Sequence, residues 1–391
     1  MANKINTFKR LLFTPALLFT ALTAFATIPD ESEHRHSNAV SHSESPKEKK
    51  FNAGELIIGH ITDAHDWHIA GEGDNSISLP LPVIVYSSER GLDIFLSNKF
   101  EHGHKTFNGY MLEHNNIVAV NEMESVSAHE ATINEELTTN LWDISITKNV
   151  VAMFFSIALM LWMFISVART YARTPGKAPK GMQSLLEPLI VFVRDDIAKS
   201  AIGEKRYKRY LPFLLTVFFF LWINNLMGLI PILPGGANLT GNIAIGLTLA
   251  AIVFIITLVT ANKNYWRHII AMPGVPIGVL VLLTPIEIFG MFLKPFVLMI
   301  RLFANMMAGH IIALSFFSLI FIFAEMNTGL GWGVGVFSVA FTIFMGMLEL
   351  LVAFLQAYVF TLLAAMYFGA AIDEGHDPNN HVDDHAHDRN F

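Results

Sequence analysis

The residues most able to do chemistry lie inside two apolar stretches near the C-terminus. "PFVLMIRLFANMMAGH" (295–310) contains Arg301, Asn305 and His310, and "LELLVAFLQAYVF" (348–360) contains Glu349 and Gln356. A charged side chain at membrane depth costs at least about 2.5–3.5 kcal/mol on insertion scales, so a functional role is the default interpretation. Imidazole and carboxyl groups exchange protons, whereas arginine keeps its proton and acts as a fixed positive field. These residues predict proton transfer.

Helical periodicity places the five side chains at two levels. At 100° per residue, Arg301 and Asn305 lie about 40° apart, whereas His310 lies about 13 Å farther along the axis and roughly on the opposite side. Glu349 and Gln356 share a face of the following helix. In an antiparallel hairpin of these helices, His310 is level with Glu349, and Arg301 with Gln356. The spacing predicts two aqueous half-paths on opposite faces, with the arginine charge between them.

Each of these residues also has a purely structural interpretation. Arg301 can pair with an acid such as Glu287 or Glu349, and His310 can be a hydrogen-bonded histidine within a helix bundle. The two amides can hydrogen-bond across helices. Lys294 is expected to extend its ammonium group to the cytoplasmic interface.

Composition predicts an all-α integral membrane protein. Of 391 residues, 53% are hydrophobic and only 15% are charged, and the charges cluster at the ends and in short loops. Such a chain is too apolar for an ordinary soluble domain. We expect about five transmembrane helices. They lie near 150–168, 210–231 and 242–262, once within 276–324, and from the Gly-rich break "NTGLGWG" (327–333) to about Ile372.

One or two further helices are expected to lie in the membrane plane. "MQSLLEPLIVFVRDDIAK" (182–199) mixes apolar and charged residues at helical spacing. Residues 276–324 exceed one span, so their first part is expected to lie shallow or re-entrant, with a long tilted helix beginning at Pro295. The last two long helices then form a tilted antiparallel hairpin, with a turn centred near residue 329.

The N-terminal part has a different character. Lys4, Lys9 and Arg10 precede an apolar stretch that ends in "AFA", which predicts a signal peptide over 1–26, with an uncleaved anchor as the alternative. Residues 27–140 form a small polar, His-rich extracytoplasmic region, in which "LPLPVIVYSS" and "GLDIFLS" are typical of short strands.

Loop charge predicts the orientation of the membrane domain, 141–373. The positive-inside rule places the basic stretches 169–209 and 263–268 in the cytoplasm of a bacterium. The N-terminus is then extracytoplasmic, and the acidic, His-rich tail 374–391 is cytoplasmic. The chain is expected in the bacterial inner membrane, in contact with the lipid bilayer.

Several classes of function are excluded. The absence of cysteine excludes disulfides and thiolate chemistry, and there is no Gly-rich phosphate loop, nucleophile elbow or HExxH motif. Basic residues are too few and scattered for a nucleic-acid surface. We expect no enzyme activity of its own, no cofactor and no metal site. Two His-rich segments admit metal capture, but solvated polar sequence is the preferred interpretation. Their histidines are His60, His65, His68, His376, His381, His385 and His387.

The two C-terminal stretches also resemble a known family. "LKPFVLMIRLFANMMAGH" (293–310) and "LELLVAFLQAYVFTLL" (348–363) are similar to the two signature helices of subunit a of rotary ATP synthases, and the likeness extends over roughly 140–373. The resemblance implies a proton-conducting stator subunit with two aqueous half-channels that load and unload the carboxylates of a rotating c-ring. It also implies contact with subunit b of the peripheral stalk.

The resemblance assigns roles residue by residue. Arg301 matches the family's essential arginine, Asn305 its partner one turn on, and Gln356 the glutamine that faces it. Positions 310 and 349 match a pair that is often Glu then His, and here the order is His310 then Glu349. The exchange keeps one imidazole and one carboxyl at the same level, so we expect the proton relay to survive it.

The alternative from another class is a secondary transporter whose buried arginine binds an anionic substrate. Such transporters usually have repeated halves with paired broken helices. This sequence shows no such repeat. An intramembrane hydrolase would require a nucleophile–base pair or a metal motif, and neither is present.

Overall fold

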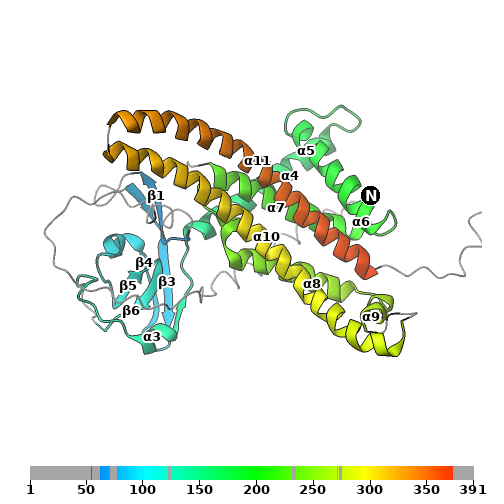
Figure 1. Cartoon of the computed structure of the whole chain (residues 1–391), viewed down its shortest axis with the longest axis horizontal. Coiled ribbons are helices and arrows are strands. Elements are labelled where there is room, and N and C mark those ends of the chain that lie inside the picture. The colour runs from blue at the N-terminus through cyan, green and yellow to red at the C-terminus, as the bar shows by residue number, and fades with distance from the viewer. Residues whose placement is uncertain are drawn as a thin grey trace, which may run out of the picture.

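The computed structural model describes residues 54, 62–70, 77–121, 125–230, 235–270, 272, 275–326 and 328–372. The expected signal peptide, the acidic tail and His60 lie outside these residues. The described chain has a strand-rich N-terminal part followed by a bundle of long helices (Figure 1).

The N-terminal part contains three small antiparallel sheets, in the orders β1-β2, β4-β3-β7 and β5-β6. Its elements are β1 (Asp66–Ala70), β2 (Ile77–Pro80), β3 (Pro82–Ser87), β4 (Gly91–Leu96), η2 (Ser97–Gly103), β5 (Tyr110–Glu113), β6 (Asn116–Ala119), α3 (Glu135–Thr139) and β7 (Leu141–Asp143). The strands expected in "LPLPVIVYSS" and "GLDIFLS" are confirmed as β3 and β4.

Side chains on alternate faces of β3 explain which of its residues are buried. Val83 and Val85 point to one side and pack with Phe100 and Tyr110 in a compact core. Successive side chains of a strand face opposite sides, so this period of two fixes the face that is buried. A small apolar core thus holds the N-terminal domain together.

The membrane part has five helices long and apolar enough to cross a bilayer, as expected. They are α4 (Lys148–Arg173), α7 (Tyr207–Leu229), α8 (Ile243–Thr260), α10 (Ile277–Met326) and α11 (Thr328–Ile372). Shorter helices connect them: α5 (Met182–Phe192), the π-helical η3 (Val193–Lys199), α6 (Ser200–Ile202), η4 (Leu239–Gly241) and α9 (Lys263–Ile270). The helix expected over 182–199 is confirmed.

The predicted break at Pro295 is wrong. Pro285 and Pro295 both lie inside α10, a single helix of 50 residues, and at 1.5 Å per residue it is about 75 Å long. Ending a helix in hydrocarbon leaves backbone groups without partners, which costs more than the one donor that each proline lacks. The Gly-rich "NTGLGWG" is likewise mostly helical, since α11 begins at Thr328.

Helices α10 and α11 lie side by side as an antiparallel hairpin (Figure 1). Gln356 bonds the carbonyl of Leu302, and Glu349 lies against Gly309. The midpoints of both pairs fall at residue 329, so the predicted centre of the turn and the predicted levels are confirmed.

Burial differs sharply between the helices. The apolar window of α7 is 83% buried, whereas that of α11 is only 11% buried. Helix α7 is therefore the centre of the bundle, and the hairpin leaves most of its surface uncovered by the rest of the chain.

Candidate functional site

Gln356 is the centre of a buried hydrogen-bond network. Its side chain is 3% exposed, its Nε2 donates to the Leu302 carbonyl at 2.6 Å, and its Oε1 accepts from Asn225 Nδ2 at 3.2 Å. Asn225 Nδ2 also approaches the Ala353 carbonyl at 3.1 Å, and its Oδ1 accepts from Thr240 at 2.7 Å. The network connects α11 to α10 and α7, as the structural interpretation of this amide predicts.

Arg301 and Asn305 lie on the outside of the hairpin. Both side chains are exposed, which agrees with the expectation that they share one face of α10. Among the described residues, no carboxylate oxygen comes within 4 Å of the Arg301 guanidinium. The predicted pairs with Glu287 or Glu349 are therefore absent from this part of the chain. Gln356 is level with Arg301 but is bonded elsewhere.

His310 and Glu349 line a cavity of about 310 Å³ between α10 and α11, on the side of Arg301 that faces the turn of the hairpin. Leu229, at the end of α7, lies in the same wall, and Asn305 also contributes. The helical phase predicted Asn305 and His310 on nearly opposite sides of α10. The structure brings both to one cavity because the space extends over more than a turn of the helix.

Two polar atoms of the residues that line this cavity make no hydrogen bond to the described part of the chain. His310 Nε2 and Glu349 Oε1 are buried, and neither has a hydrogen-bond partner among the described residues. The bonded bundle histidine considered above is therefore not what the structure contains. A Cβ at Gly309 would lie 2.9 Å from Glu349 Oε1, so the glycine allows the carboxyl to lie against α10.

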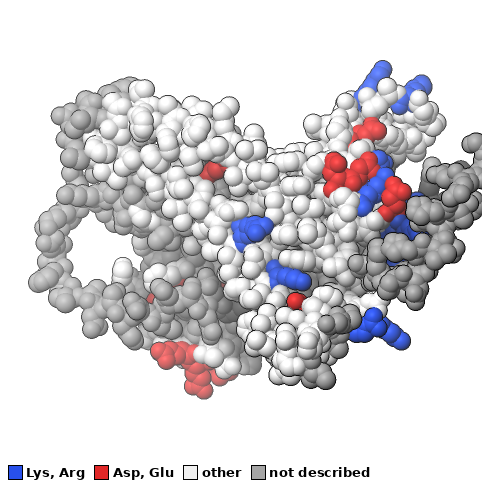
Figure 2. All heavy atoms as spheres, turned by 45° about the vertical axis from the view of Figure 1, so that its right-hand side comes forward, with Lys and Arg blue, Asp and Glu red and all other residues white. Residues whose placement is uncertain are grey.

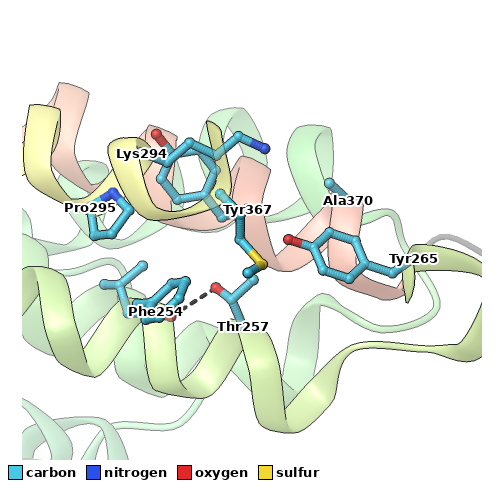
Figure 3. Close-up of a pocket in the computed structure, with 9 residues that line it drawn as sticks. Phe254, Thr257, Tyr265, Lys294, Pro295, Tyr367 and Ala370 are labelled. Atoms are coloured by element: carbon cyan, nitrogen blue, oxygen red, sulfur yellow. Dashed lines mark hydrogen bonds between the residues drawn. The ribbon is translucent and has the colours of Figure 1, made fainter. Parts of the chain in front are cut away.

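A second, smaller cavity of about 20 Å³ lies toward the other end of the hairpin. Figure 3 shows Lys294 and Tyr367 close together, with Tyr265 from α9 and Thr257 from α8 around the same space. Lys294 Nζ lies 5.8 Å from the centroid of the Tyr367 ring. A cavity of this size holds about one water molecule.

Arg301 lies between the two cavities along α10. The smaller cavity uses Met291, Lys294 and Pro295 of this helix, and the larger begins at Asn305. Arg301 is not among the lining residues of either. The two spaces are thus separated along the hairpin at the level of the arginine.

Charge on the helical part is sparse. Figure 2 shows a face that is white over most of the bundle, with isolated basic side chains near its middle and mixed charges toward its right. Within the described residues, no group of three or more His, Asp or Glu side chains is arranged to hold a metal ion.

Sequence reasoning missed three residues of this region. Asn225 and Thr240 complete the network around Gln356, and Lys148 lies close enough for its charge to act on His310. Adjacent asparagines in the uncharged "FLWINNLMG" were the available signal for the first. Nothing local marks Lys148, because only the packing of α4 brings it near α10.

Fold and site together define a polytopic membrane protein with two cavities along its last two helices. Residues 150–369 match the family described as ATP synthase A chain, and residues 56–144 match a family described as Domain of unknown function (DUF8433). The chain is 41% identical to ATP synthase subunit a of Chloroherpeton thalassium over 253 residues, which cover 62% of this chain and 72% of that protein.

Other relatives agree. Identity is 44% over 243 residues to ATP synthase subunit a 2 of Prosthecochloris aestuarii, covering 60% of this chain and 72% of that one. The sequence identity to ATP synthase subunit a of Myxococcus xanthus is 40% over 253 residues, which cover 63% of this chain and 78% of that protein. The chain belongs to the family of subunit a of the ATP synthase membrane sector. It is a non-catalytic membrane component of that complex.

Proposed function

We propose that the chain is the proton-conducting stator subunit of a rotary ATP synthase in a bacterial inner membrane. Two aqueous half-channels load and unload the carboxylates of a c-ring, and Arg301 separates them. The observation that carries this proposal is the pair of cavities at different levels of the hairpin, with Arg301 between them along α10.

His310 and Glu349 carry protons in the larger cavity. Each has a buried polar atom that no described residue hydrogen-bonds, and both line a space large enough for several water molecules. An imidazole and a carboxyl beside water exchange protons readily, since each group both accepts and releases one near physiological pH when its surroundings are tuned. Protons then move between these groups and a ring carboxylate.

Arg301 acts through its charge. The guanidinium keeps its proton, repels cations and favours the ionised form of any carboxyl that approaches it. Its side chain is exposed on a hairpin that the rest of the chain leaves mostly uncovered. The carboxylate is therefore supplied by another subunit, and Asn305 lies beside the place where it arrives. Gln356, on α11, holds α10 in position through its hydrogen bond to the Leu302 carbonyl.

The loop charges support the orientation given above. With 169–209 and 263–268 in the cytoplasm, the N-terminal domain and the larger cavity lie toward the outside, and the smaller cavity lies toward the cytoplasm. Further partners are subunit b of the peripheral stalk and the lipid bilayer.

The transporter alternative is less well supported by the geometry. An anionic substrate bound to an arginine needs an enclosing pocket, and ligand pockets usually measure about 300–1,000 Å³. The larger cavity reaches this range, but Arg301 is not among the residues that line it.

The deciding experiment is Arg301→Ala in inverted vesicles that contain the whole ATP synthase. We expect loss of both ATP synthesis and ATP-driven proton pumping, because the barrier between the half-channels and the partner of the ring carboxylate are both removed. Arg267→Ala, which changes a basic residue of α9, is the matched control and should retain both. Intact pumping in Arg301→Ala vesicles would refute the assignment.

A further inference from the structure

The N-terminal domain is fixed directly onto the first turn of α4. Asp63 accepts hydrogen bonds from Thr147 Oγ1 at 2.8 Å and from the backbone N–H of Asn149 at 3.2 Å. The N–H of Lys148 donates to the Ala64 carbonyl at 3.0 Å. A carboxylate that accepts from the N–H groups at a helix start is a favourable cap. Segment 63–67 is therefore held at the outer end of the membrane bundle.

Contacts continue from this segment to the larger cavity. Trp67 packs with Ala152 of α4 and Ala237 of the α7–α8 connection. A Cβ at Gly228 would lie 3.5 Å from the Ala237 carbonyl oxygen and 3.8 Å from His310 Nε2. Trp67 and His310 thus lie close to Ala237 and Gly228, two residues that approach each other where α7 leads into α8.

Buried polar atoms without partners occur along this route. They are His65 Nδ1, Asn149 Oδ1 and Asn238 Nδ2, in addition to His310 Nε2 and Glu349 Oε1 in the cavity itself. Such atoms are rare in folded proteins, and ordered water usually satisfies them. His65 is 4% exposed, and its Nε2 lies 3.1 Å from Asp143 Oδ2. Its Nδ1 is therefore the nitrogen available for exchange.

Charges of both signs surround His65. Asp143 faces it from β7, Asp63 and Asp66 flank it on its own segment, and Lys148 follows on α4. The charges of Asp63 and Asp66 act on Lys148, and Asp66 also lies 3.5 Å from His102 of η2. The negative charges of Asp63 and Asp66 therefore compensate the positive charge of the Lys148 ammonium group at the outer end of the path.

We propose that the N-terminal domain forms the extracytoplasmic mouth of the proton path, in which His65, oriented by Asp143, passes protons between outside water and the His310–Glu349 cavity. This inference rests on the proposed function. In each passage the imidazole gains one proton at Nδ1 and releases it from the same nitrogen to the next water. The Nε2–H stays hydrogen-bonded to Asp143, and no other bond changes.

Asp143 is suited to this positioning role. Burial alone would raise the pKa of its carboxyl, but the hydrogen bond and charge of His65, together with the hydrogen bonds to Ser145, hold that pKa below its usual value. The carboxyl therefore stays ionised and keeps accepting from the imidazole. The match of 56–144 to a family without an assigned function leaves this domain open to such a role.

The test uses the whole ATP synthase reconstituted in vesicles, with passive proton conduction measured as the pH on the extracytoplasmic side is varied. We expect His65→Gln to slow conduction several-fold and to change how the rate depends on extracytoplasmic pH. Asp143→Asn, which keeps the imidazole, should change that dependence on pH less than His65→Gln does. His129→Gln changes an exposed histidine of the same domain and should leave rate and profile unchanged.

Two results would overturn the inference. One is an unchanged rate and profile in His65→Gln. The other is a rate lowered by the same factor at every pH, which indicates a structural role for the histidine. Arg301→Ala is measured beside these variants. ATP-driven proton pumping that survives in Arg301→Ala contradicts the proposed function itself, whereas loss of pumping there with no effect of His65→Gln on conduction contradicts only the extracytoplasmic mouth.

Discussion

The two polar levels of the α10–α11 hairpin differ in how fully their groups are bonded. At the level of Arg301, the neighbouring amide of Gln356 uses both its ends in hydrogen bonds to Leu302 and Asn225. One level nearer the turn, His310 Nε2 and Glu349 Oε1 are buried without partners beside a cavity. The same two helices thus contain a saturated polar layer and an unsaturated one.

This difference in bonding separates groups that hold the helices in place from groups that are able to transfer protons. A buried polar group whose bonds are all made within the protein stabilises one arrangement and is costly to disturb. A titratable group with an atom that makes no hydrogen bond within the protein can bond to water instead and transfer a proton to it. The saturated layer therefore holds the hairpin, and the unsaturated layer is the one to which we assign proton transfer in the proposed function.

The largest expected effect is that of Glu349→Gln. The substitution keeps the shape of the side chain and removes its exchangeable proton, so passive conduction should fall on the order of 10²-fold, within what a positioned proton-transfer group contributes. Proton flux into vesicles with the whole complex measures this. Glu287→Gln, near the other end of α10, is the control, and an unchanged rate in Glu349→Gln would remove Glu349 from the path.

A smaller and different effect is expected for Gln356→Leu. The change leaves the Leu302 carbonyl and the Asn225 amide without their partner, and interhelical hydrogen bonds in membranes contribute about 1–2 kcal/mol in model peptides. Thermal unfolding of the complex should shift to lower temperature, with a smaller loss of conduction than in Glu349→Gln.

Thr361→Val is the matched control for this change. Thr361 is buried but bonds only to the Ala357 carbonyl of its own helix, so its loss should affect stability less. If Gln356→Leu retained full stability while conduction fell as far as in Glu349→Gln, the amide would belong to the conducting layer instead.

The smallest effect lies outside the membrane. Because the pKa of Asp143 is lowered in the folded protein, its ionised form stabilises the N-terminal domain above the unfolded pKa, near 3.9. That stabilisation is lost as pH falls through the lower folded pKa. Hydrogen exchange of residues 141–147 should accelerate in wild type below about pH 4, and Asp143→Asn should show no such acid-dependent change. Parallel acid profiles of the two proteins would contradict this.

The saturated and unsaturated layers differ in how far sequence could predict them. Helical periodicity and the constant midpoint of an antiparallel pair were enough to place His310 level with Glu349 and Arg301 level with Gln356. Whether each side chain is hydrogen-bonded was not predictable. The partner of Gln356 is Asn225 on α7, and the spacing of residues in the sequence does not reveal how each helix is rotated about its axis.

Other predictions failed for identifiable physical reasons. The proline rule predicted a helix start at Pro295, whereas hydrocarbon favours continued backbone hydrogen bonding and α10 runs through this residue. The turn expected in "NTGLGWG" is present but shorter than predicted, since α11 already begins at Thr328. His65 was interpreted as part of a solvated polar segment, but the structure buries it against Asp143. The burial of His65 depends on how the whole N-terminal domain packs against α4, and no local sequence pattern indicates that packing.

The bond from Gln356 to the Leu302 carbonyl has a mechanical consequence. Under the proposed function, each passing carboxylate pulls sideways on Arg301, and the helix that carries this arginine must not bend under the load. Gln356 grips the backbone of α10 one residue after that arginine, and Asn225 ties the glutamine to α7, the most buried helix of the bundle. Under the proposed function, the resistance of α10 to this load thus depends on the hydrogen bonds of two buried amides, Gln356 and Asn225.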